Sequence, residues 1–192
     1  MQADSSVLTN RMIRAAKLDS NLYEEVEHDQ SATTQALTVV IIVAIASGIG
    51  SGIGALLGNQ GAGAFLMALI GGIILAIIGW LVWSVIVYFV GTSLFGGSAT
   101  IGEMLRTVGF AQSPNVLAIL SFIPLLGGLI VFAASIWALI ALIIGIRQAL
   151  DFTTGKAVLT AIIGWIVYII IIAIIGGIIG LAAFGGAALM RM

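Results

Sequence analysis

The sequence predicts an all-α fold: a polytopic transmembrane helical bundle of five spans, the third one short or kinked, with a short amphipathic N-terminal head. The first observation behind this prediction is composition, since 61% of the 192 residues are hydrophobic and 8% are charged. Soluble domains carry about 25% charged residues. A soluble chain of this length could not bury so much apolar surface, so lipid is the expected solvent.

The second observation is the placement of the charges. Nine of the fifteen charged residues lie among the first 30 residues, and the rest of the chain holds six. We therefore expect a polar segment, 1–33, that is cytosolic or lies on the membrane surface, and a transmembrane domain, 34–192. A net charge of -1 offers no basic face for nucleic acid. With no cysteine and one histidine, His28, we expect neither a metal site nor a cofactor.

The polar segment is predicted to form two short helices. In residues 5–17 the apolar side chains can share one broad face that the basic residues avoid, which is typical of a helix at a membrane surface or docked on a partner. A second helix is expected after Asp19, with Asn21 and Glu24 spaced as a capping pair.

The third observation is a succession of long apolar runs, of which the first two span residues 34–57 and 64–94. The second run exceeds the roughly 30 Å hydrocarbon core, so it must tilt, kink or protrude. The first contains four glycines at GxxxG spacing, which lets another helix backbone approach closely; a flexible hinge is the alternative. The predicted helix-packing residues are Gly48, Gly50, Gly52 and Gly54.

A capping box of Thr100 and Glu103 opens the third helix. The polar run Gln112-Ser113-Pro114-Asn115 interrupts it, and the apolar part that follows is far shorter than the ~20 residues of a full span. Either residues 101–123 form one complete kinked span, or an interfacial helix precedes half a span.

The fourth and fifth spans are expected over residues 129–146 and 157–183, joined by a polar hairpin, 147–156. Lys and Arg near span ends prefer the cytoplasmic side. Five spans with the N-terminus inside place Arg147 and Lys156 inside, whereas four spans would place them outside. The charges therefore favour five.

Residues 76–83 and 161–168 resemble each other and, in a five-span chain, run antiparallel. Such a match suggests a weak internal repeat, although low-complexity apolar sequence also produces it by chance. Each segment carries tryptophan, and the tryptophans of the chain are interpreted as packing residues or interface anchors: Trp80, Trp83, Trp137 and Trp165.

The few charges of the membrane domain are candidate intramembrane or interfacial polar pairs, because a charge in lipid costs at least ~2.5 kcal/mol. Glu103 and Arg106 are three residues apart, and Arg147 and Asp151 are four apart, so each pair can meet on a helix face. The alternative is an ion or substrate path lined by Glu103, Arg106 and Asp151. No nucleophile–histidine constellation and no phosphate loop is present in the sequence, so we expect no catalytic residue and no enzyme activity.

Several segments together resemble the prokaryotic branch of the Yip (Ypt-interacting protein) domain family. The resemblance implies a five-span membrane domain with a cytosolic N-terminus. Eukaryotic members of that family bind Rab-type GTPases and take part in membrane traffic. The segments that carry the resemblance are residues 11–19, 22–27, 95–97, 103–111 and 147–157.

The function expected from these features is that of a non-enzymatic integral membrane scaffold or assembly subunit that acts through helix–helix packing. Its expected partners are the lipid bilayer and other membrane protein subunits or further copies of itself. The expected location is the cell membrane, as a multi-pass protein of the bacterial inner membrane. Two alternatives remain: a small ion or solute transporter or channel, and a trafficking adaptor like the eukaryotic Yip proteins.

Overall fold

The computed structural model describes residues 5–58 and 61–189, with side chains up to residue 177. All of the regular secondary structure in this part of the chain is helical, which confirms the all-α class. Four helices are long and apolar enough to cross a membrane. The expected turn at Asn59 and Gln60, and Arg191 near the C-terminus, lie outside the described residues. The elements are α1 (Ser5–Ala16), α2 (Ser20–His28), α3 (Ala32–Leu57), α4 (Gly61–Phe95), α5 (Ile101–Ala111), η1 (Ser113–Phe122), α6 (Leu126–Ala149) and α7 (Thr154–Leu189).

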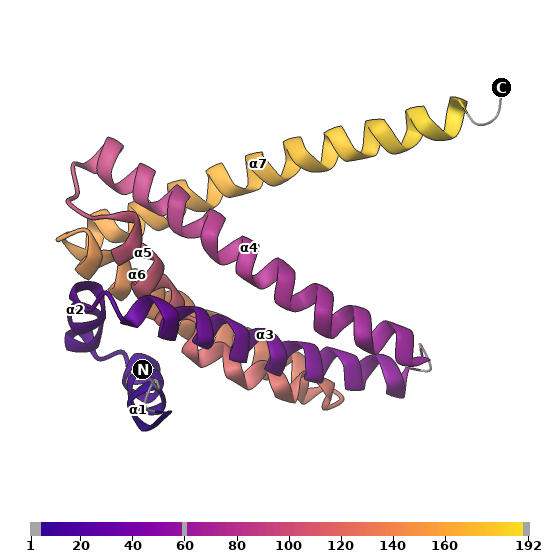
Figure 1. Cartoon of the computed structure of the whole chain (residues 1–192), viewed down its shortest axis with the longest axis horizontal. Helices are drawn as coiled ribbons and strands as arrows, with labels where there is room; N and C mark the ends of the chain where they lie inside the picture. The colour runs from indigo at the N-terminus through magenta and orange to yellow at the C-terminus, as the bar shows by residue number, and fades with distance from the viewer. Residues whose placement is uncertain (1–4, 59–60, 190–192) are drawn as a thin grey trace.

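The long helices run back and forth between two ends of the molecule (Figure 1). One end, here called the polar end, gathers the head helices α1 and α2, the α4–α5 connection and the α6–α7 hairpin. A hydrogen bond joins two of these connections, from Lys156 Nζ to the Phe95 carbonyl at 3.1 Å. At the opposite end α3 and η1 finish, and α4 and α6 begin.

The segment between α4 and α6 consists of two pieces of different helix type. The capping box is confirmed: Thr100 Oγ1 accepts from the Glu103 amide at 3.2 Å, and the Glu103 carboxylate accepts from the Thr100 amide at 2.8 Å. The α-helix ends at Ala111, and a 3₁₀ helix with Pro114 in its first turn continues the path. Pro114 lacks the amide that an α-helix would need there, so the chain is held by the tighter 3₁₀ pattern, η1, against α3 and α6.

Two helix ends show how local sequence sets the connections. Helix α4 stops at Gly96, which takes a positive φ of 67°, as glycines often do at helix C-termini, and the Gly97 amide then donates to the Gly91 carbonyl at 3.1 Å. Helix α2 is capped by Asp19, whose side chain accepts from the Asn21 amide. The prediction that Asn21 and Glu24 form the cap was therefore wrong by two residues.

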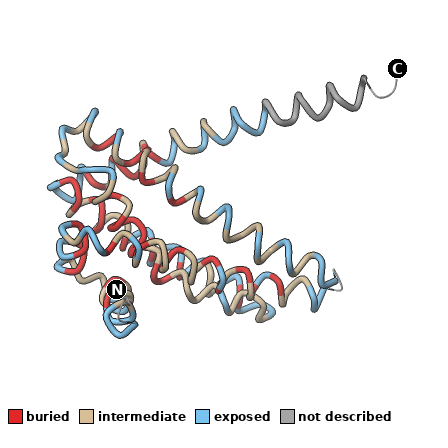
Figure 2. Tube along the Cα trace, in the orientation of Figure 1, coloured by how far each residue is buried: buried red, intermediate tan, exposed pale blue. Residues whose placement is uncertain are grey.

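The buried core lies toward the polar end, where the head packs on α5 and α6 (Figure 2). Tyr23, Phe110 and Ile146 are fully buried there. Away from this end α7 diverges from the other helices (Figure 1), and many of its apolar side chains up to residue 175 are exposed. The molecule is thus tightly packed at one end and open between α4 and α7 at the other.

Candidate functional site

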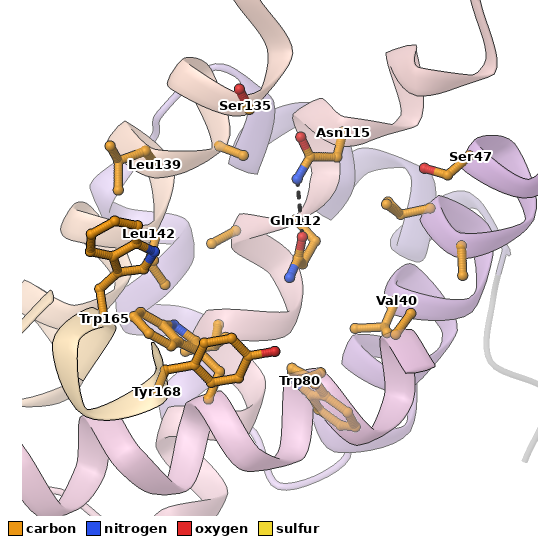
Figure 3. Close-up of a pocket in the computed structure, with 18 of the residues that line it drawn as sticks. Val40, Ser47, Trp80, Gln112, Asn115, Ser135, Leu139, Leu142, Trp165 and Tyr168 are labelled. Carbon is orange, nitrogen blue, oxygen red and sulfur yellow. Dashed lines mark hydrogen bonds between the residues drawn. The ribbon is translucent and has the colours of Figure 1, made fainter. Parts of the chain in front are cut away.

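A cavity of ≈ 1010 Å³ lies between α3, α4, the α5–η1 segment, α6 and α7. Its volume is at the upper end of the range of about 300–1,000 Å³ that is usual for small-molecule sites. The walls are mostly apolar, and polar side chains face the space at a few points (Figure 3). The polar and aromatic lining residues are Ser47, Ser51, Trp80, Trp83, Gln112, Asn115, Ser135, Trp165 and Tyr168.

The break between α5 and η1 supplies the most polar part of the cavity wall. Asn115 Nδ2 donates to Gln112 Oε1 at 3.0 Å, and Figure 3 shows this amide pair standing in the space between the helices. Helix α5 has 11 residues, so Gln112 lies about 18 Å along the helix from the Thr100 cap.

Aromatic rings form another part of the wall. The Trp83 and Tyr168 rings meet edge to face, with centroids 6.0 Å apart. The Trp80 indole is buried and donates to the Leu105 carbonyl at 3.0 Å. Trp83, Trp165 and Tyr168 each lie eleven or more residues from the polar-end terminus of their helix, well below the interfacial level where anchoring aromatics gather. Of the two roles expected for the tryptophans, packing is the one that fits Trp80, Trp83 and Trp165, which line the cavity.

The two segments of the suspected repeat face each other across this cavity. Gly79, Trp80 and Trp83 come from α4, and Trp165 and Tyr168 come from α7. Trp83 and Tyr168 occupy equivalent positions in the two segments and contact each other. An antiparallel pair related by an approximate twofold axis would place equivalent residues in contact in this way.

Arg106 lies at the polar end and is 6% exposed. Its Nε donates to the Val26 carbonyl at 2.8 Å, its Nη2 donates to the Glu27 carbonyl, and its Nη1 reaches Thr33 Oγ1 at 3.3 Å. The expected partner, Glu103, is occupied in the capping box. Arg106 therefore fastens the C-terminal turn of α2, whose last carbonyls have no partner within the helix, instead of pairing with Glu103.

Arg147 and Asp151, the second expected pair, also lie at the polar end, where α6 finishes. Arg147 Nε donates to Gln148 Oε1 at 3.0 Å, and Asp151 is exposed with a positive φ of 52°. The left-handed turn ends α6 before Asp151, so the two residues do not share the helix face that their spacing suggested. Among the described residues, all ion pairs lie in the head.

The head is held together by two arginines of α1. Arg11 donates to Glu25 Oε1 at 2.9 Å, to Asp29 Oδ2 at 2.8 Å and to Gln35 Oε1 at 2.9 Å. Arg14 donates to Asp19 Oδ2 at 2.8 Å. The hydrogen bond from Arg14 holds the pKa of the Asp19 carboxyl below its usual value. These contacts fix α1 against α2 and the start of α3.

Glu27 is a buried carboxyl group at the polar end, 7% exposed, and its Oε2 has no hydrogen-bond partner. Burial, and after it the Glu24 carboxylate, raises the pKa of Glu27 to about 7. His28 Nδ1 lies 3.6 Å from Glu27 Oε1. Glu24, Glu27 and His28 are close together, and in the sequence only their spacing on one helix indicated this grouping.

The glycines of α3 face two neighbours within the same chain. A Cβ atom at Gly48 would meet Leu69 of α4, and one at Gly50 would collide with backbone carbonyls of η1. A Cβ atom at Gly52 would collide with the Phe65 ring of α4. At Gly54 no atom lies within 4 Å of that position. The first three therefore allow close approach of helices inside this chain.

The sequence did not single out the amide pair Gln112–Asn115 or Tyr168 as site residues. The usable signal was the polar quartet 112–115 inside an apolar stretch, because polar side chains at membrane depth are costly and tend to be functional. Tyr168 could not have been found in this way, since its place in the cavity depends on how α7 packs against α4.

Comparison with known families agrees with the resemblance seen in the sequence. The model of the Yip1 domain matches residues 20–176, which include α2 to α6 and the part of α7 that borders the cavity. The chain matches no curated protein and no solved structure. The match covers most of the 192 residues, and the chain belongs to the Yip1 domain family of multi-pass membrane proteins.

Proposed function

We propose that the protein is a non-enzymatic scaffold or assembly subunit of the cell membrane, which acts by packing its transmembrane helices against those of partner proteins. The observation that carries the proposal is the divergence of α7 from the rest of the bundle (Figure 1). Transmembrane helices associate through van der Waals packing and interhelical hydrogen bonds. Helix α7 packs on α4 and α6 in its first part, and the part that diverges from them has that capacity left for another subunit.

We further propose that the chain crosses the membrane five times, with the α5–η1 segment as the third crossing. The ten residues of η1 span about 20 Å, because a 3₁₀ helix rises about 2.0 Å per residue. With the ~16 Å of α5 this path is long enough for a ~30 Å core. The positive-inside rule then favours the polar end, with Arg147 and Lys156, on the cytosolic side of a bacterial inner membrane.

Crosslinking tests the scaffold proposal, and the absence of cysteine from the chain makes it specific. Ile170 on α7 is 52% exposed and Phe132 on α6 is 64% exposed, and both lie roughly 24 Å from the polar end of their helices. We expect Ile170→Cys in native membranes to form a crosslink to a second copy or to one reproducible membrane subunit, identified by mass spectrometry. Phe132→Cys, the matched control, should stay monomeric.

Equal crosslinking of the two variants would reflect random collision in the bilayer and would contradict the proposal. A complete lack of crosslinks from Ile170→Cys and from neighbouring positions on the same face, such as Ile166 and Ile174, would also contradict it. A crosslinked product of twice the monomer mass would identify the partner as a second copy of the chain.

The cavity favours a second candidate function, the binding or transport of an uncharged molecule. Its lining residues include no acidic or basic side chain. Glu103 and Arg106, the residues considered for an ion path, are engaged at the polar end. The chemistry of the cavity therefore points away from ions and toward a neutral ligand.

A further inference from the structure

The cavity has no charge with which to hold an ionised group. None of its lining residues is Asp, Glu, Lys, Arg or His. A charged headgroup in this cavity would lose its hydration without gaining a counter-charge, which is prohibitively unfavourable in a medium of low dielectric constant. Whatever occupies the cavity is therefore electrically neutral.

The polar groups at its centre are two carboxamides, which offer free donors as well as free acceptor lone pairs. Each carboxamide carries two N–H donors, and the bond between Asn115 and Gln112 uses one N–H of Asn115. Both N–H groups of Gln112 and the second of Asn115 have no other partner among the described residues. The Ser51 and Ser135 hydroxyls donate back to their own helices. Figure 3 shows the free Gln112 nitrogen and the Tyr168 hydroxyl turned toward the same space.

Unpaired donors in this cavity favour a ligand with acceptor oxygens, because an unsatisfied buried polar group costs about 1–3 kcal/mol. Water could satisfy them only in an aqueous cavity, and most of the lining here is apolar. A molecule that already resides in the bilayer reaches the site without crossing water. Carbonyl groups on a lipid would supply the acceptors.

The remaining walls suit an apolar chain. On α4 the cavity is lined by Ala68, Gly72, Ala76 and Gly79, which leave a shallow channel along the helix. A Cβ atom at Gly72 or Gly79 would have no atom within 4 Å. Away from the polar end, α4 and α7 diverge (Figure 1).

We propose that the cavity binds one molecule of an electroneutral lipid, with carbonyl oxygens of its small headgroup on the Gln112–Asn115 amide pair and its chain along the small residues of α4. Two membrane lipids share this chemistry, an isoprenoid quinone and a diacylglycerol. The inference goes beyond the scaffold proposal, because it concerns the inner wall of α4 and not the outer face of α7.

Native mass spectrometry of the purified full-length protein in mild detergent tests the inference. The probes are a short-chain benzoquinone analogue, dioctanoylglycerol and, as the charged comparison, a short-chain phosphatidylglycerol. We expect saturable binding of one molecule of the quinone, of the diacylglycerol or of both, and this outcome identifies the source of the carbonyl groups. Phosphatidylglycerol should neither bind saturably nor compete.

Gly72→Phe places a ring at a position that lines the cavity and where a Cβ atom has no atom within 4 Å, and it should weaken saturable binding of the neutral probe. Gly71→Phe is the matched control: its position also has no atom within 4 Å, but it does not line the cavity. Gly71→Phe should bind as the parent does. Gln112→Leu keeps a similar volume and removes the donors, and it should weaken binding roughly 3- to 10-fold, the effect of losing a hydrogen bond.

The proposal is overturned if neither neutral probe binds saturably, if phosphatidylglycerol binds equally well, or if Gly72→Phe and Gly71→Phe behave alike. Should Gly72→Phe prove unstable, an unchanged affinity in Gln112→Leu overturns the placement of the headgroup. If Gly72→Phe instead dissociates an oligomer, the cavity holds a partner helix and the lipid proposal fails. The Ile170→Cys crosslink in the Gly72→Phe background distinguishes a loss of lipid binding from a loss of assembly.

Discussion

Two buried ionisable residues at the polar end have opposite surroundings. The guanidinium of Arg106 donates to backbone carbonyls of α2, whose dipoles solvate its charge. The carboxylates of Glu24, Asp151 and Glu103 add to burial in raising the pKa of Glu27. The His28 imidazole, 3.6 Å away, acts in the opposite direction. Arg106 therefore holds the head in place, and Glu27 weakens that hold when it ionises.

This difference predicts a pH dependence of stability. The pKa of Glu27 is raised from 4.5 to about 7, so the folded state binds a proton more tightly than the unfolded state does. The stabilisation is fully present below pH 4.5 and is lost as the pH rises through 7. Glu27→Gln stays neutral, so above pH 7 its thermal midpoint should be higher than that of the parent. Between pH 4.5 and 7 its thermal midpoint should also change less with pH.

The measurement is the thermal midpoint of the detergent-solubilised protein across that pH range. Glu24→Gln is the comparison, because Glu24 is exposed and its nearby carboxylate raises the pKa of Glu27 less than burial does. If Glu24→Gln alters the pH dependence of the thermal midpoint as much as Glu27→Gln does, or if neither alters it, the burial of Glu27 does not cause that pH dependence.

At the scale of the elements, most of what the sequence predicted concerns local patterns. The long helices follow from apolar runs, and the start of α5 follows from the Thr100–Glu103 capping box, which is a contact between near neighbours. The 3₁₀ form of η1 was not predicted, because an apolar run with one proline is compatible with a kinked α-helix as well. It depends on packing against α3 and α6.

The contacts of Arg106 could not be predicted from the sequence, for a related reason. Its partners lie 79 and 80 residues earlier in the chain, whereas helical spacing suggested Glu103, three residues away. The cavity likewise depends on five elements meeting. Sequence periodicity describes which residues share a face of one helix, and it contains no information on which helix that face meets.

The glycines of α3 provide a prediction at this scale. Gly50→Ala should lower the free energy of unfolding by about 1–3 kcal/mol, because its Cβ would collide with the carbonyl oxygens of Ala118 and Ile119 in η1. Gly54→Ala, in open space four residues on, should be neutral or raise stability by up to ~1 kcal/mol through helix propensity. Thermal unfolding in one detergent measures both. Equal effects of the two substitutions would show that η1 does not pack on Gly50.

At the scale of the whole molecule, the path of the chain decides which connections share a side of the membrane. We expect a cysteine at Thr154, in the α6–α7 hairpin, to resist a membrane-impermeant thiol reagent added outside intact cells and to react after permeabilisation. A cysteine at Leu125, which is 99% exposed before α6, should react from outside. Labelling of Thr154→Cys from outside, or protection of Leu125→Cys, would contradict the five-crossing orientation.

The fastening of the head by Arg106 also affects the order of events during synthesis. The carbonyl of Val26 is made 80 residues before its partner, which corresponds to roughly 4–16 seconds of translation. Until Arg106 emerges, the last turn of α2 lacks this partner, although Arg11 can already hold α1 against α2. The contact between the head and α5 therefore forms only after the first two membrane helices are complete.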